Sequence, residues 1–127
     1  WETSVSMVKW ISKETPVSYG RTFIADKEMK VATIPVGYAD GYNRLLSNTG
    51  EVLIKGKRCR VLGRVCMDQF VVDVDDIENV QAGDRVILLG KMGNEEISAE
   101  ETAQRIGTIN YEVTCAISKR VVRKYVA

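Results

Sequence analysis

Histidine is absent from this sequence of 127 residues. The chain therefore cannot form a Ser–His or Cys–His nucleophile pair by itself. It also lacks the side chain that most often moves protons near neutral pH. Any proton transfer by this chain must use a tyrosine, cysteine, lysine or carboxylate side chain.

Cysteine is also scarce, with Cys59, Cys66 and Cys115 as its only occurrences. An odd count without a CxxC spacing argues against a disulfide framework and against a zinc site. We therefore predict no metal site. Free cysteine is among the most buried residue types, so we predict buried free thiols in a protein of the reducing cytoplasm.

An excess of charge of either sign is missing, because the formal net charge is +1. This balance argues against a nucleic-acid partner. The longest apolar runs, such as residues 86–90, are far too short for a membrane span, and no signal-peptide pattern is present. We expect one domain over residues 1–127. The first residue is Trp1 rather than Met, so we expect it to be part of a longer protein.

The hydrophobic pattern predicts short strands separated by turn residues. Gly56 should supply the positive φ of a tight hairpin turn, and Pro35 should lie at a strand end or a bulge. Ser98 followed by Glu101 predicts the start of a helix that ends at Gly107. The predicted strands cover residues 5–11, 31–36, 52–54, 60–62, 70–74, 85–89 and 121–126, and a second short helix covers 111–118.

Six or seven short strands and one or two short helices favour a mostly β fold. We predict a small closed or partly closed β-barrel, similar to a Greek key, in preference to a sandwich. Such a domain could be a binding or dimerisation module with no catalytic role. Binding of single-stranded nucleic acid would need a basic groove with stacking aromatics, and neither the charge nor the 7% aromatic content supports it.

Four segments carry the residues best suited to chemistry. Three of them place a tyrosine beside glycine or asparagine, and the fourth concentrates an arginine, a cysteine, a methionine and an aspartate. Each has a structural explanation, since tyrosine rings pack and glycines serve turns. The segments are Val17–Thr22, Ile34–Tyr42, Val61–Gln69 and Ile109–Val113.

These four segments, in this order and spacing, resemble the C-terminal domain of the alanine racemases. The resemblance extends from about residue 10 to residue 125. It implies a preceding barrel domain, absent from this chain, whose lysine holds pyridoxal 5'-phosphate. It also implies a cytoplasmic bacterial homodimer that interconverts L- and D-alanine for peptidoglycan precursors.

The resemblance assigns Tyr19 the role of catalytic base, delivered to the active site of the partner subunit. An unperturbed tyrosine has a pKa of about 10, and lowering that pKa to near 7 requires about 4 kcal/mol. Burial alone raises a tyrosine pKa, so cations or strong donors must stabilise the phenolate. Arg21 would share a face with Tyr19 on a strand, but the resemblance places the main donors on the barrel.

The resemblance assigns the remaining site residues to cofactor and substrate. Tyr111 corresponds to a tyrosine that binds the cofactor phosphate and narrows the substrate entrance. Tyr38 lines the access path, where Arg64 suits an arriving carboxylate. The segment Cys66, Met67 and Asp68 corresponds to a substrate-binding segment from the partner subunit.

The substrate is open to one alternative. Related serine racemases share this domain and tend to carry a smaller polar residue in place of Tyr111. The tyrosine here favours alanine, while serine or a broad substrate range stays possible. The isolated chain, without the cofactor lysine, should be inactive.

Overall fold

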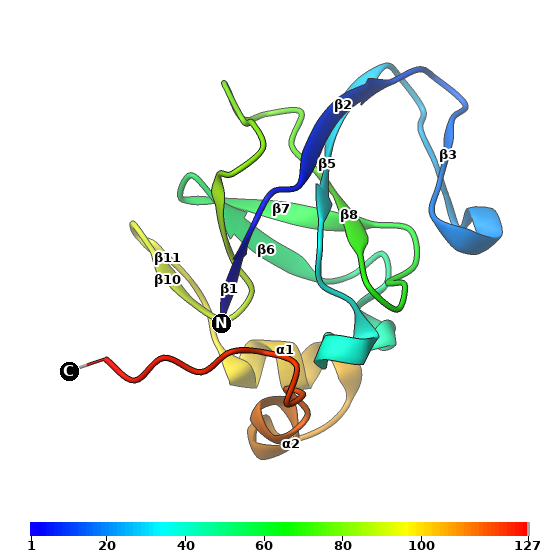
Figure 1. Cartoon of the computed structure of the whole chain (residues 1–127). Helices are drawn as coiled ribbons and strands as arrows, with labels where there is room; N and C mark the ends of the chain where they lie inside the picture. Colours follow the sequence, from blue (N-terminus) through cyan, green and yellow to red (C-terminus); the bar gives the residue numbers. More distant parts are fainter. Residues whose placement is uncertain (127) are drawn as a thin grey trace.

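The computed structural model describes residues 1–126 and contains a curled antiparallel sheet with two short helices at one end (Figure 1). The sheet strands are β1 (Glu2–Ser4), β2 (Met7–Ile11), β5 (Met29–Ile34), β6 (Glu51–Ile54), β7 (Lys57–Leu62), β8 (Phe70–Asp73) and β9 (Arg85–Ile87). Two hairpins and the helical elements complete it: β3 (Pro16–Val17), β4 (Phe23–Ile24), β10 (Gly90–Met92), β11 (Glu95–Ile97), η1 (Tyr19–Arg21), η2 (Tyr38–Asp40), η3 (Arg44–Leu46), α1 (Ala99–Ile106) and α2 (Asn110–Cys115).

The strand order is β1-β9-β6-β7-β8-β5-β2, so the first two strands of the chain form opposite edges of the sheet. Only Val5 and Ser6 separate them. The Val5 amide donates to the Asp84 carbonyl at 2.8 Å, and the Ser6 amide donates to the Thr33 carbonyl at 3.0 Å. The chain itself therefore joins the two edges. Strands β5 to β8 follow a Greek-key order, which confirms the predicted partly closed barrel.

The main core lies inside this curl. Alternate residues of β5 and β8 point inward, as expected for a pleated strand, and they include Ala32, Ile34, Phe70 and Val72. The ring of Tyr42 stacks on Phe70 with centroids 4.4 Å apart. Burial raises the pKa of the Tyr42 hydroxyl, so this tyrosine stays neutral and serves packing.

A second, smaller core lies on the outer side of β5 and β7. Val17 and Phe23 of the β3–β4 hairpin pack there against Val31 and Leu62. This hairpin carries η1 at its tip, so the outer core fixes where residues 19–21 sit on the barrel. The hairpin was not predicted because its strands have only two residues each.

Most of the predicted elements are confirmed. The Lys55–Gly56 turn has positive φ at both residues and joins β6 to β7, as a tight hairpin requires. The Glu101 amide donates to the Ser98 hydroxyl at 3.0 Å, and α1 ends at Gly107. The second predicted helix is α2, and Pro35 directly follows β5.

Three predictions need correction. Residues 121–126 form no strand, because a strand needs a hydrogen-bonded neighbour and the tail lies beside none. The strand predicted over residues 5–11 begins only at Met7, because Val5 and Ser6 carry the chain from one sheet edge to the other. Of the three cysteines, only Cys59 is buried, and burial raises its thiol pKa to about 12.

Neither helix within residues 1–126 is both long and apolar enough to cross a membrane.

Ion pairs attach α1 to the barrel. Arg58 on β7 donates to both carboxylate oxygens of Glu101, at 2.7 and 2.9 Å, and to Glu95 at 3.0 Å. Arg105 donates to Glu51 at 2.6 Å. Bidentate arginine–carboxylate pairs are both strong and directional, so this network fixes the helix that precedes the α2 segment.

The substitution Glu101→Gln should destabilise the chain by about 1–2 kcal/mol at pH 7. Hydrogen bonds from Arg58 lower the pKa of Glu101, so its stabilisation is present above the unfolded-state pKa of about 4.3. It disappears as pH falls through the lowered folded-state pKa. Denaturant unfolding should therefore show a difference from the unsubstituted chain that shrinks in acid. Glu100→Gln, an exposed neighbour on α1, is the control, and equal effects of the two variants would contradict the prediction.

Candidate functional site

The Tyr19 turn differs from the extended segment that the sequence suggested. Ser18, Gly20 and Arg21 all have positive φ, so the chain reverses sharply around Tyr19. As a consequence Arg21 does not share a strand face with Tyr19. The Tyr19 side chain is 75% exposed, which leaves its hydroxyl available to another molecule or domain.

Arg64, rather than Arg21, lies over the Tyr19 ring. Its guanidinium carbon is 5.9 Å from the ring centroid, within the range of a cation–π contact. Arg64 lies in the segment that follows β7, and this segment faces the Tyr19 turn. A loop distant in the sequence therefore places a positive charge beside this tyrosine.

Gly63 permits the close approach of these two loops. Its φ is +76°, and a Cβ atom there would lie 2.7 Å from the Val17 carbonyl oxygen and 2.9 Å from the Ser18 Cβ. A larger residue would push the Tyr19 turn away from Arg64. The glycine is thus required both by its backbone conformation and by its neighbours.

The Tyr38 loop is bound to the Cys66–Met67 segment through the backbone. The Tyr38 amide donates to the Cys66 carbonyl, and the Ala39 amide to the Met67 carbonyl, both at 3.0 Å. A Cβ atom on Gly37 would lie 2.2 Å from the Cys66 carbonyl oxygen. Gly37 has an extended φ of −148°, so close approach, and not turn geometry, demands glycine here.

These loops form one open groove. It brings together five of the seven residues that the sequence predicted for the site, and it adds two that were not predicted. The lining residues are Tyr19, Tyr38, Arg44, Arg64, Val65, Cys66 and Met67.

Arg44 is the chief addition to the site. Its guanidinium carbon is 5.9 Å from the Tyr38 ring centroid, so two arginines flank the groove beside two tyrosines. The sequence segment from Arg44 to Gly50 carried no recognised signal. The tandem turns η2 and η3, which place Arg44 beside Tyr38, could be found only in the folded chain.

Asp68 points to a different partner. Its carboxylate accepts a bond from Arg120 at 3.0 Å, and Arg120 also lies 3.3 Å from Asp40. Asp40 in turn accepts from the Gly37 amide at 3.0 Å. Arg120 therefore joins the C-terminal segment both to Asp68 and, through Asp40, to the Tyr38 loop, and Asp68 does not line the groove.

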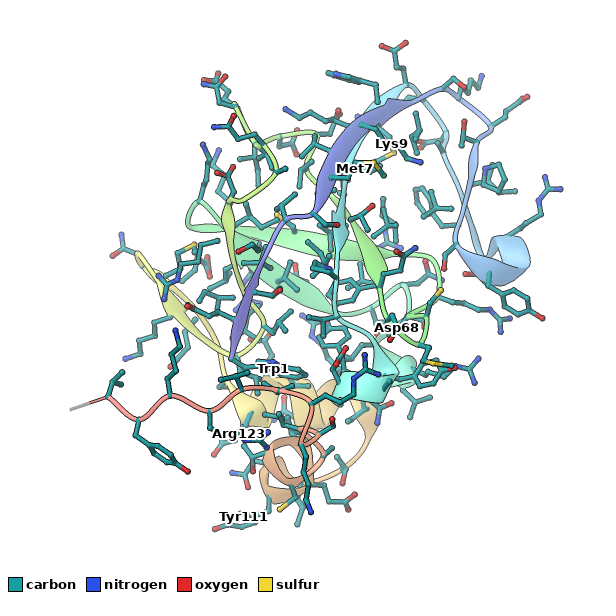
Figure 2. All side chains as sticks on the ribbon, in the orientation of Figure 1. Trp1, Met7, Lys9, Asp68, Tyr111 and Arg123 are labelled. Atoms are coloured by element: carbon teal, nitrogen blue, oxygen red, sulfur yellow. The ribbon has the colours of Figure 1, made fainter. Side chains whose placement is uncertain are left out.

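Tyr111 lies apart from the groove. It is on α2, 74% exposed, and it lines a shallow surface with Ile109 and Gln104. Figure 1 shows α2 below the barrel and the β3–β4 hairpin at its side. In Figure 2 the Tyr111 side chain points outward, away from Asp68. The structure thus separates Tyr111 on α2 from the five predicted residues that line the groove.

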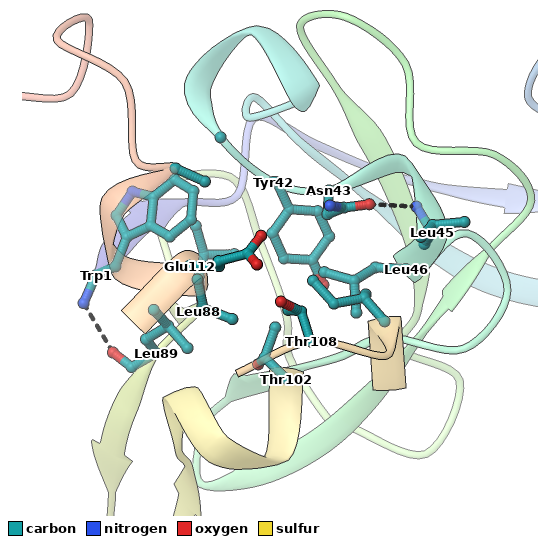
Figure 3. A pocket seen from close by; sticks show the side chains of 14 residues that line it. Trp1, Tyr42, Asn43, Leu45, Leu46, Leu88, Leu89, Thr102, Thr108 and Glu112 are labelled. Carbon is teal, nitrogen blue, oxygen red and sulfur yellow. Dashed lines mark hydrogen bonds between the residues drawn. The ribbon is translucent and has the colours of Figure 1, made fainter. Parts of the chain in front are cut away.

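A third cavity lies where the helices meet the barrel end (Figure 3). Its lining is largely apolar and includes Tyr42, Leu46, Leu88 and Ile106. The Trp1 backbone nitrogen at its rim donates to the Leu89 carbonyl at 2.7 Å. No residue predicted for the site lines this cavity, so its residues serve the junction of helices and barrel.

The substitution Gly63→Ala should destabilise the chain by about 2–4 kcal/mol, because it adds a backbone clash to an unfavourable φ. Gly56→Ala is the matched control: its φ is +78°, yet no heavy atom lies within 4 Å of the added Cβ. The control should cost only about 1 kcal/mol. Denaturant unfolding of both variants gives the comparison, and equal losses would show that the two loops do not constrain each other.

This chain is similar to known proteins in both sequence and structure. The profile of the family described as alanine racemase, C-terminal domain, matches residues 1–125. The alanine racemase of Halothermothrix orenii is 48% identical over 125 residues, which are 98% of this chain and 33% of that protein. The chain therefore spans about a third of the length of this relative.

Solved structures of alanine racemases are also similar to this chain. The alanine racemase from D-cycloserine-producing Streptomyces lavendulae superposes with a TM-score of 0.93 at 40% identity, over 99% of this chain and 33% of that one. The alanine racemase from Bartonella henselae, with covalently bound pyridoxal phosphate, gives 0.92 at 33% identity, over 98% and 34%.

Proposed function

Because this chain belongs to the alanine racemase C-terminal domain family, we propose that it completes the active site of an alanine racemase by supplying Tyr19 as one of two acid–base residues. The observation that carries the proposal is the Tyr19 turn. A phenol hydroxyl projects from it with an arginine beside the ring, in a chain that has no histidine.

Racemisation needs two proton-transfer groups on opposite faces of the α-carbon. One group removes the α-proton, and the other returns a proton to the opposite face. Tyr19 would be one of them, and the lysine of a separate barrel domain would be the other. When bound, pyridoxal 5'-phosphate delocalises the negative charge that develops at the α-carbon.

Tyr111 fits a role toward the cofactor phosphate. A phenol hydroxyl can donate a hydrogen bond to a phosphate oxygen, and the exposure of this side chain on α2 allows it to reach a neighbouring domain. The barrel would supply the cofactor lysine. The presence of Tyr111 also favours alanine over serine as the substrate.

The groove beside Tyr19 suits a small amino-acid carboxylate. Arg44 and Arg64 place positive charge along it, which attracts an anion approaching from water. Tyr38 would line the access path, and the Met67 backbone would contact the carboxylate. Cys66 shapes the wall of the groove, and Asp68 holds the adjoining segment through Arg120.

Exposed apolar side chains support assembly with other domains. Met67, Ile109 and all three site tyrosines are large and solvent-exposed, and exposed apolar patches mark interaction surfaces. Because the groove and the α2 surface are separate, one can meet the chain's own barrel and the other a second subunit. We place Tyr19 in the site of the partner subunit of a cytoplasmic homodimer that makes D-alanine for peptidoglycan.

The substitution Tyr19→Phe in the full-length enzyme should lower kcat for racemisation by about 10²–10⁴-fold, because it removes one proton-transfer group. Cofactor binding should persist, as judged by the absorbance of the bound cofactor. Tyr125→Phe is the control, since Tyr125 is 96% exposed in the C-terminal tail. Near-normal turnover by Tyr19→Phe would refute its role.

The isolated 127-residue chain should show no racemase activity with added pyridoxal phosphate, because the second acid–base group lies on another domain. Circular dichroism establishes that the sample is folded, and a coupled assay for D-alanine measures turnover. Measurable racemisation by the folded chain would contradict this division of labour.

A further inference from the structure

The residue immediately before Tyr19 has an unusual backbone conformation. Ser18 has φ +68° and ψ 178°, a region that is populated almost solely by glycine. Side chains held there cluster at functional sites, where surrounding contacts enforce the conformation. Glycine would adopt this conformation without strain, so we expect the Ser18 side chain to have a role that glycine could not fill.

The Ser18 side chain makes two contacts with the opposite loop. Its hydroxyl donates to the Arg64 carbonyl at 2.6 Å, and its oxygen lies 3.4 Å from the Cys66 Sγ. Because the Ser18 hydroxyl donates its proton to the Arg64 carbonyl, the Ser18 oxygen can accept a hydrogen bond from the Cys66 thiol. Ser18 therefore bridges the Tyr19 turn and the segment that carries Arg64.

Crowding on both sides leaves this bridge little freedom. A Cβ atom on Gly20 would lie 2.9 Å from the Arg64 Nε, and one on Gly63 would lie 2.9 Å from the Ser18 Cβ. The turn is held between these contacts while its tyrosine projects outward. The Ser18 hydrogen bond thus ties the backbone next to Tyr19 to the Arg64 carbonyl on the opposite loop.

We infer that Ser18 is a positioning residue, which holds the Tyr19 turn against the Arg64–Cys66 loop so that the phenol meets the α-carbon of the substrate. The inference rests on the proposed function of Tyr19. Ser18 itself need not touch the substrate. Misplacement of a reacting group by about 1 Å can cost about 10²-fold in rate, so loss of this bond should be visible in kcat.

The experiment compares Ser18→Ala and Ser18→Gly in the full-length enzyme. Both remove the hydroxyl, but glycine also relieves the unfavourable backbone conformation. We expect both variants to lower kcat by about 10-fold or more, with KM changed less than about twofold. Ser18→Gly should melt no lower than the unsubstituted enzyme, which separates positioning from loss of fold. Ser12→Ala, before the same hairpin, is the matched control.

Isotope exchange gives a readout that a structural role would not change. In deuterated water, racemisation needs both proton-transfer groups, whereas α-proton exchange of one enantiomer needs only the lysine. Displacement of Tyr19 should therefore raise the ratio of exchange to racemisation for that enantiomer. A general loss of folded enzyme would lower both rates by the same factor.

Three results would overturn the inference. Unchanged kcat and exchange ratio in Ser18→Ala, beside a strongly impaired Tyr19→Phe, would refute the role of Ser18 alone. Recovery of the normal ratio in Ser18→Gly would show that the hydroxyl is not responsible. Near-normal turnover in Tyr19→Phe would refute the proposed function and this inference together.

Discussion

The rest of the structure depends on the hydrogen bonds that join the two ends of one curled sheet. Val5 and Ser6 carry the chain from β1 to β2, and their amides donate to Asp84 beside β9 and to Thr33 on β5, at opposite ends of the sheet. The curl that results encloses the core around Phe70 and fixes the strand ends from which the loops emerge.

Loops from three parts of the sequence meet at one side of this sheet. Backbone hydrogen bonds join the Tyr38 loop to the Arg64–Met67 segment, and the Ser18 hydroxyl joins the Tyr19 turn to the same segment. Glycines permit these close approaches. The outer core beneath β3 and β4 supports the Tyr19 turn. Tyr19 projects from this held turn with its ring exposed.

The division of site residues between the groove and α2 has a mechanistic meaning within the proposal. A racemase needs access to both faces of one carbon atom, and a single small domain cannot surround its substrate. The domain would instead present Tyr19 on one surface and Tyr111 on another, so each can meet a different barrel. The ion pairs from Arg58 to Glu101 then help to hold the helical surface in place relative to the groove.

The sequence by itself determined the fold class, the capped helix at Ser98, the tight turn at Gly56 and the four segments that identify the family. These signals are local: they depend on turn chemistry, capping and the order of short motifs. The tertiary structure decided what local signals cannot encode. It placed Arg64 rather than Arg21 beside Tyr19, brought Arg44 to Tyr38, left residues 121–126 without a strand partner and set Tyr111 apart from the groove. Each of these outcomes depends on contacts between residues distant in the chain, which become defined only when the sheet curls and its loops pack.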